Sequence, residues 1–170
     1  FHMATDASAP GFGFLDRPGL PGLFGALMDE YARAAEDFCR AIETASPDRY
    51  AKERPSDDPD TVSLRALCAH AVGAAYRYSD YIRQARALPF AERYVLPPTD
   101  LPSPESVRPR LAAALRYTEA GLAGWYEDPM LAAEVSFTVR WGPTYDPEMI
   151  LEHAIVHLLR HRRQIERWGD

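Results

Sequence analysis

The last long segment of the chain, residues 146–169, reads DPEMILEHAIVHLLRHRRQIERWG. It opens with Asp146, Pro147 and Glu148, which supply a helix cap, a first-turn proline and an acid near the positive end of the helix dipole. Arginines gather toward the other end, at Arg160, Arg162, Arg163 and Arg167. Apolar residues share one face between them: Leu151, Ala154, Leu158 and Ile165. The segment is therefore predicted to be an amphipathic helix whose apolar face needs other helices to cover it.

Three earlier segments, residues 20–45, 60–87 and 103–126, carry apolar residues at alternating three- and four-residue steps. Prolines cluster in the stretches that separate the four segments, where they interrupt helices. Amphipathic helices of this length bury their apolar faces by packing against one another. The sequence therefore predicts an all-α fold, a four-helix bundle that forms a single domain over residues 4–170.

Two connections carry signals of their own. Residues 88–102 could span about 50 Å if extended, which is enough to return along a whole helix and make the second and third helices parallel. Residues 134–139 alternate polar and apolar side chains, which predicts a short extended piece packed over the bundle. Asp58 and Pro59 match a cap and first-turn proline for the second helix.

Length and charge limit the class of protein. The 170 residues suit one domain, and 46% hydrophobic with 26% charged residues is typical of a chain that folds in water. The 19 Lys and Arg against 25 Asp and Glu give a net charge of −6, which disfavours nucleic acid and anionic membranes as partners. No apolar run reaches the roughly 18 residues that cross a bilayer. Without a recognisable signal peptide, a cytoplasmic location is predicted.

Two smaller features lie outside the functional argument. Phe1, His2 and Met3 look like a cloning remnant followed by the starting methionine, so His2 is not treated as a ligand. Cys39 and Cys68 lie in apolar periodic segments without CxxC spacing. We expect both to be buried, reduced side chains.

The remaining histidines occupy only two places. His70 lies in the second predicted helix, whereas His153, His157 and His161 lie in the fourth. Residues four apart share a helix face, so His157 and His161 can direct ring nitrogens at one point. A helical wheel places both, and His70 on its own helix, beside the apolar face, but points His153 well away. Because bundles build metal sites from such side chains, the sequence predicts a metal site at His70, His157 and His161.

Two other arrangements stay open. His153 and His157 could form the metal-binding pair, or the histidines could be hydrogen-bonded packing residues without a metal. Three neutral imidazoles around a tetrahedral ion leave one open position, which is the pattern of catalytic rather than structural sites. That pattern predicts a small-molecule substrate.

Further residues are candidates for roles around the site. Gln164 shares the face of His157 and His161, and could orient a ligand or water or be an exposed helix-end side chain. Trp141 and Tyr145 precede the fourth helix and could wall a pocket or plug the core. The arginine cluster could receive an anion, although it is more typical of a solvated helix end.

The stretch HAIVHLLRHRRQI, residues 153–165, resembles the HxxxHxxxHRxQ-type motif on the last helix of the DinB/YfiT-like proteins. The stretch LCAH, ending at His70, resembles the partner motif on their second helix. The resemblance implies a four-helix bundle of up-down-down-up topology in which His70, His157 and His161 bind a divalent metal, usually zinc or nickel. That superfamily includes metal-dependent thiol S-transferases and a thiol-dependent isomerase, so a low-molecular-weight thiol is an expected co-substrate.

Two hypotheses of different classes follow. The first is a divalent-metal-binding DinB-like protein with metal-dependent hydrolase or thiol S-transferase activity at an open coordination position. The alternative is a non-enzymatic bundle that binds a partner or forms a homodimer, with a structural metal or none.

Overall fold

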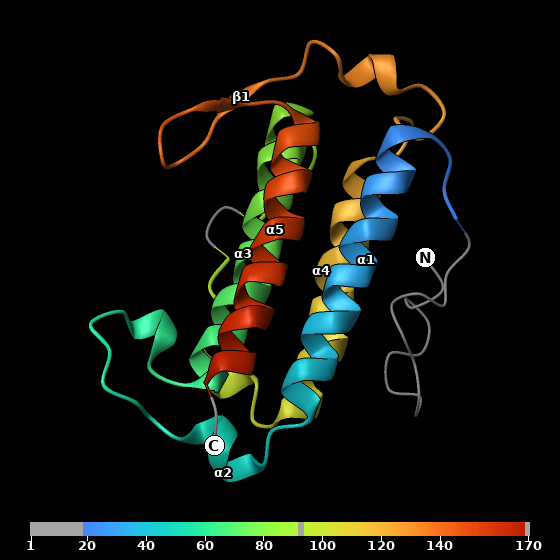
Figure 1. Cartoon of the computed structure of the whole chain (residues 1–170). Coiled ribbons are helices and arrows are strands. Elements are labelled where there is room, and N and C mark those ends of the chain that lie inside the picture. Colours follow the sequence, from blue (N-terminus) through green and yellow to red (C-terminus); the bar gives the residue numbers. More distant parts are fainter. Residues whose placement is uncertain (1–18, 92–93, 169–170) are drawn as a thin grey trace.

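Four long helices pack side by side as a bundle in the computed structural model, which describes residues 19–91 and 94–168 (Figure 1). The helices are α1 (Gly22–Glu43), α3 (Leu64–Ala85), α4 (Val107–Gly121) and α5 (Pro147–Arg167). The prediction of an all-α four-helix bundle is confirmed. Residues 1–3, interpreted above as a remnant with a starting methionine, lie outside the described residues.

The helices run up-down-down-up, as expected. Around the bundle, α1 packs on α5, α5 on α3, α3 on α4 and α4 on α1. Figure 1 shows α1 and α5 running in one direction and α3 and α4 in the other. Hydrogen bonds join the C-terminal ends of α3 and α4, where Arg83 Nη1 donates to Tyr117 O at 3.1 Å and Arg86 Nη2 to Ala123 O at 3.0 Å. The chain between these parallel helices therefore returns along the bundle, which confirms the long crossover.

Short elements fill the connections. They are α2 (Pro47–Ala51) and the 3-10 turns η2 (Pro59–Thr61), η3 (Pro98–Asp100), η4 (Pro104–Ser106) and η5 (Pro129–Ala132). Ahead of α5, β1 (Phe137–Thr138) and β2 (Thr144–Tyr145) form an antiparallel hairpin with Phe137 opposite Tyr145. The extended piece predicted over residues 134–139 is thus shorter than expected and finds its partner strand six residues on.

The start of α3 differs from the prediction because two capping side chains compete. Asp58 Oδ1 accepts a hydrogen bond from Asp60 N at 3.0 Å and so caps the turn η2. Ser63 Oγ accepts from Ala66 N at 3.0 Å and caps α3, which begins at Leu64. Residues 59–61 therefore form a separate turn beside α3. This turn brings Asp60 to a position that it would not reach if α3 began at residue 60.

The third long helix ends earlier than predicted. It stops at Gly121, and the chain then turns inward at Trp125, which is buried and lies 5.5 Å from the ring of Phe24. Gly124 has a φ of +86°, a left-handed conformation that favours glycine and ends helical geometry. Trp125 therefore joins the core from a turn.

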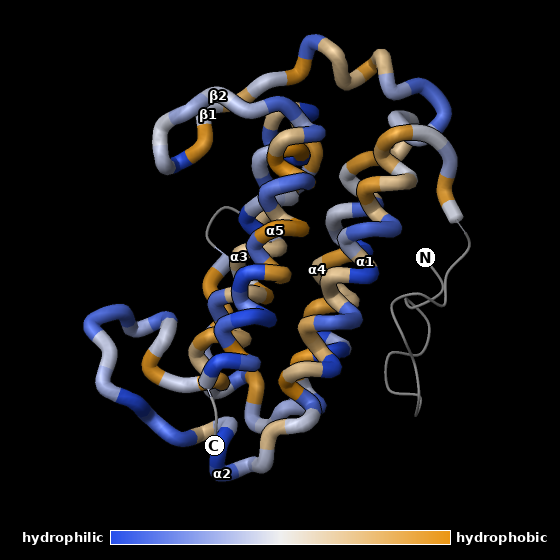
Figure 2. Tube along the Cα trace, viewed as in Figure 1, coloured by the Kyte–Doolittle hydropathy of each residue, from blue (hydrophilic) through white to orange (hydrophobic). Residues whose placement is uncertain are grey.

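Hydrophobic and hydrophilic residues alternate along each helix, as expected for amphipathic helices (Figure 2), and the hydrophobic ones form the buried core. The largest fully buried side chains are Tyr31, Tyr50, Phe38, Met28, Ile42, Leu64, Leu67, Ile82, Leu101 and Leu111. Cys39 and Cys68 are buried and free, as expected. No helix in the described part of the chain is long and apolar enough to cross a membrane.

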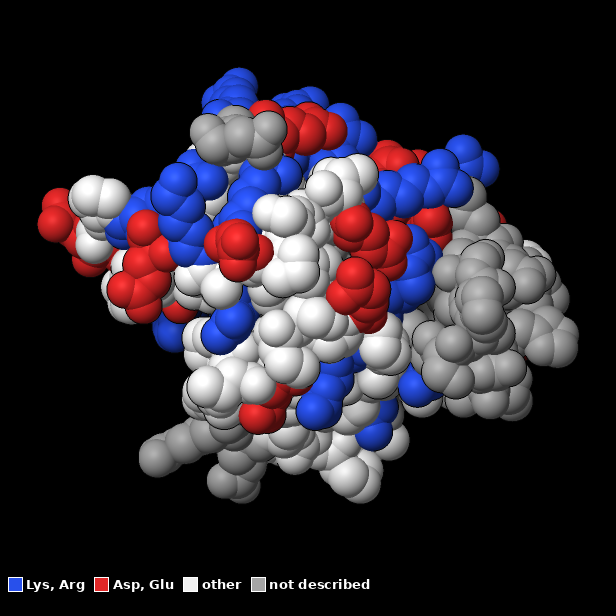
Figure 3. All heavy atoms as spheres, turned by 90° about the horizontal axis from the view of Figure 1, so that it is seen from below, with Lys and Arg blue, Asp and Glu red and all other residues white. Residues whose placement is uncertain are grey.

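The C-terminal end of α5 is tied to its neighbours. Arg162 Nη1 lies 3.2 Å from Asp37 Oδ2 of α1, and Arg49 Nη2 donates to Trp168 O at 2.9 Å. Figure 3, which looks onto this end of the bundle, shows basic and acidic side chains interspersed. These contacts hold the histidine-bearing half of α5 in place.

Candidate metal centre

Two antiparallel helices bring three histidines together. His70 lies in the second turn of α3, and His157 and His161 lie one turn apart in the second half of α5. Because α3 and α5 pack against each other in opposite directions, the start of one meets the end of the other. The structure therefore places the three predicted ligands in one cluster, although His70 lies 87 residues before His157 in the chain.

The Nε2 atoms of the three rings converge. His157 Nε2 lies 3.1 Å from His70 Nε2 and 3.1 Å from His161 Nε2. One ring nitrogen from each histidine lies within 4.8 Å of the other two. Two nitrogen ligands of a tetrahedral zinc ion, each about 2.0–2.1 Å from it, lie about 3.3 Å apart. The spacing of the rings is therefore close to that of a shared metal ion.

Side-chain oxygens hold the far nitrogens of two rings. Asp60 Oδ2 lies 2.8 Å from His70 Nδ1, and Gln164 Oε1 lies 3.0 Å from His161 Nδ1. A carboxylate or amide oxygen can only accept, so both Nδ1 atoms donate and both Nε2 atoms present lone pairs. Metal-ligating histidines are oriented in this way in proteins generally.

Burial favours the neutral form of two rings of the cluster, His157 and His161. His161 is only 8% exposed, and His70 and His157 are partly buried. Loss of solvation lowers the pKa of His157 to about 2, with the neighbouring histidines His161 and His70 contributing further. Burial also lowers the pKa of His161, although the hydrogen bond to Gln164 opposes this shift. Neutral imidazole is the form that binds metals.

The donor set fits a divalent cation. With Nδ1 protonated on His70 and His161, the two short Nε2 contacts can share at most one proton, that of His157. At least one of the two 3.1 Å contacts therefore lacks a hydrogen bond. A cation between the rings would give all three nitrogens a partner, and imidazole nitrogens suit zinc, nickel and related ions.

His153 takes a different place from the cluster. Its ring stacks on Trp141 with centroids 4.7 Å apart, and the ring of Tyr78 meets it edge-on with centroids 5.1 Å apart. Tyr145 completes this aromatic group, 5.7 Å from Trp141. The structure thus brings His157 together with His70 and His161 rather than with His153. Trp141 is 44% exposed, so it is not a core plug.

The aromatic group borders the cluster through one side chain. Tyr78 lies 5.4 Å from the ring of His157 and 6.3 Å from that of Trp141. Burial raises the pKa of Tyr78 to about 12, so its hydroxyl is neutral at physiological pH. Tyr78 and His153 therefore lie between the pair Trp141 and Tyr145 and the cluster of three histidines.

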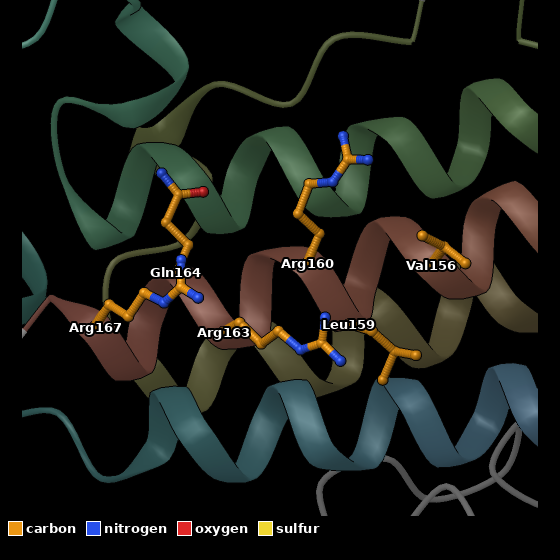
Figure 4. Close-up of a pocket in the computed structure, with 6 residues that line it drawn as sticks. All are labelled: Val156, Leu159, Arg160, Arg163, Gln164 and Arg167. Carbon is orange, nitrogen blue, oxygen red and sulfur yellow. The ribbon is translucent and has the colours of Figure 1, made fainter.

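The arginine cluster of α5 divides between two surroundings. Arg162 pairs with Asp37 and with Glu166, each at 3.2 Å. The others line a surface cavity of about 500 Å³ on the outer face of α5, together with Gln164: Arg160, Arg163 and Arg167. In Figure 4 Arg160 and Gln164 extend toward α3, whereas Arg163 extends toward α1. Gln164 also contacts His161 of the cluster.

Asp60 was missed by the sequence analysis. It lies ten residues before His70, and helical spacing places residues ten apart about 15 Å from each other along the axis. The separate turn η2 folds back beside α3 and removes that distance. The paired caps Asp58 and Ser63 are the signal that could have indicated such a turn.

In comparisons with protein families, with curated proteins and with solved structures, nothing matches this chain. The fold and the cluster therefore stand on the chain's own residues: a helical bundle with a buried group of three histidines that could bind a metal.

Proposed function

We propose that this chain is a metal-dependent protein of the DinB/YfiT-like class, in which His70, His157 and His161 bind zinc or nickel. The observation that carries the proposal is the convergence of three Nε2 atoms, two of them from rings whose Nδ1 atoms are held by Asp60 and Gln164. The up-down-down-up topology and the histidine motif of α5 support the family assignment.

The proposed activity is hydrolysis or thiol transfer. A divalent cation, when bound, supplies Lewis-acid activation of a water, a thiol or a carbonyl oxygen. All three protein ligands are neutral, so they would not offset the positive charge of the ion. Asp60 and Gln164 fix the two outer rings, and the ring edge of Tyr78 packs against His157 and limits its contact with water.

Metal analysis of untagged protein tests the site. We expect about one equivalent of zinc or nickel, and its loss in His157→Ala and in His161→Ala. His153→Ala is the matched control, because His153 lies on the same helix but outside the cluster. A metal content that is the same in all four proteins would show that the cluster is not a metal site.

The activity is tested separately. The metal-loaded protein is incubated with a low-molecular-weight thiol and electrophilic acceptors, and with ester and amide substrates, and thiol loss or hydrolysis is measured. Activity that disappears on chelation and in His157→Ala supports the enzyme. A protein that binds metal, loses stability on chelation and has no such activity would support the structural alternative.

A further inference from the structure

A second group of charged side chains lies next to the histidine cluster. A cavity of about 310 Å³ opens between α3, the turns η2 and η3 and the β1–β2 hairpin. His70 and its partner Asp60 line one part of it, and Arg77 and Arg140 line another. One of the three candidate ligands therefore belongs both to the metal site and to this cavity.

A glycine sets the position of Arg77. Gly73 lies in the interior of α3, where glycine costs about 1 kcal/mol relative to alanine. A Cβ atom at Gly73 would lie only 3.1 Å from Arg77 Nη1, so the guanidinium occupies the space that a side chain would take. Gly73 is three residues after His70, about 4.5 Å along the helix. The guanidinium thus reaches back toward the histidine cluster.

The hairpin supplies the second arginine. The backbone N–H of Arg140 donates to Tyr81 Oη of α3 at 2.8 Å, which fixes this part of the hairpin against the helix. Stacking of Phe137 on Tyr81, with centroids 5.4 Å apart, supports the same contact. Arg140 is therefore held at the rim of the cavity although it lies 63 residues after Arg77 in the chain.

The charges of this region are mainly positive. Burial lowers the pKa of the half-buried Arg77, and the nearby charge of Arg140 lowers it further. Within the described ranges neither guanidinium forms an ion pair, and Asp60, the carboxylate that lines the same cavity, is engaged by His70. Arg160 carries a further positive charge and extends from α5 toward α3 (Figure 4). Like charges held together at a cavity favour an anion between them.

We propose that Arg77 and Arg140 bind a carboxylate or phosphate group, so that the substrate of the metal site is a small anion. This rests on the proposed function and specifies its substrate class. Guanidinium groups bind both oxyanions through paired hydrogen bonds. The glycine in α3 exists, on this view, to let Arg77 lie beside the cluster.

Calorimetric titration of zinc-loaded protein tests the proposal, with succinate as the charged probe and succinamide as its neutral counterpart. We expect Arg77→Gln and Arg140→Gln each to weaken succinate binding about tenfold or more, because each removes a charge-assisted hydrogen bond. Arg33→Gln is the control, since it removes the same charge from an exposed position on α1. Orthophosphate, titrated in parallel, distinguishes a phosphate from a carboxylate preference.

Gly73→Ala tests the position of the Arg77 guanidinium without removing its charge. It keeps both arginines but displaces the Arg77 guanidinium, so we expect weaker succinate binding with an unchanged zinc content and a melting temperature at or above that of the parent. Succinate affinity unchanged in Arg77→Gln and Arg140→Gln would overturn the anion site.

The two proposals fail differently. Succinate is also titrated into chelator-treated protein, where only the arginines can distinguish it from succinamide. If this protein binds succinate more tightly than succinamide, and metal analysis of the untreated protein finds no metal, the metal site is ruled out and the anion site is kept. Stoichiometric metal without any effect of the arginine variants would do the reverse.

Discussion

Asp60 and His70 form the contact that links the turn η2 to the histidine cluster, with Oδ2 2.8 Å from Nδ1. The carboxylate is exposed, yet it fixes which nitrogen of His70 faces the other two rings. The orientation of the cluster on the α3 side therefore depends on a residue outside the bundle helices.

Asp60→Ala should weaken zinc binding about 10- to 100-fold, the usual effect of removing a partner that orients a ligating histidine. Competition with a chromophoric chelator measures the affinity. Asp57→Ala is the matched control, because Asp57 is exposed in the same connection. Equal affinities for the two variants would contradict a role of Asp60 at the site.

Gln164 should act on His161 in the same way. Gln164→Leu removes the acceptor of the 3.0 Å contact with His161 Nδ1, and we expect zinc affinity to fall about 10-fold or more. Gln164→Glu keeps an acceptor oxygen at the same position, so its affinity should stay near that of the parent. If Leu and Glu at this position gave the same affinity, the hydrogen bond would not orient the ring.

The metal-free protein should lose stability as the pH falls below about 6.5, the ordinary pKa of histidine. The pKa of His157 is lowered to about 2 in the folded state, so the unfolded chain takes up the proton first. Stability is complete above the unfolded pKa and falls by ~1.4 kcal/mol per pH unit for one such histidine.

Urea unfolding of chelator-treated protein at pH 7.5, 6.5 and 5.5 measures this loss. The same series on His157→Gln is the control, and its unfolding free energy should depend less steeply on pH. Identical slopes for parent and variant would show that His157 titrates normally in the folded protein.

Arg108 should matter for the bundle rather than for the site. Its guanidinium lies 2.7 Å from Glu36 Oε2 and 2.6 Å from Glu43 Oε1, which joins α4 to α1. Because Glu36 is buried, Arg108→Ala leaves a buried carboxylate with fewer partners and should cost about 3 kcal/mol of unfolding free energy. Arg110→Ala, at an exposed position of the same helix, should change it by less than about 0.5 kcal/mol. Zinc content should be unaffected in both variants, which metal analysis would check.

The sequence predicted the four helices because their apolar spacing and proline boundaries are local signals. It also selected His70, His157 and His161, because the side of a helix on which a residue lies follows from its position relative to the apolar face. Metal binding by the three stays a prediction. The placement of His153 beside Trp141 depends on the hairpin, whose position over α5 no helical wheel describes.

Other parts of the site depend on contacts between distant segments. Asp60 reaches His70 only because two caps divide one predicted helix start into a turn and a helix. Arg140 reaches the cavity of Arg77 because a hairpin after α4 attaches to Tyr81. Neither relationship has a fixed spacing in sequence, so only the folded chain reveals it.

The pairing of α5 with α1 and α3 has a consequence for how the protein matures. Two of the three candidate ligands lie on α5, which docks on α1 more than 100 residues earlier in the chain. Contacts of such long range form late and slow the folding of small domains. The metal would accordingly bind to an assembled bundle instead of nucleating its folding.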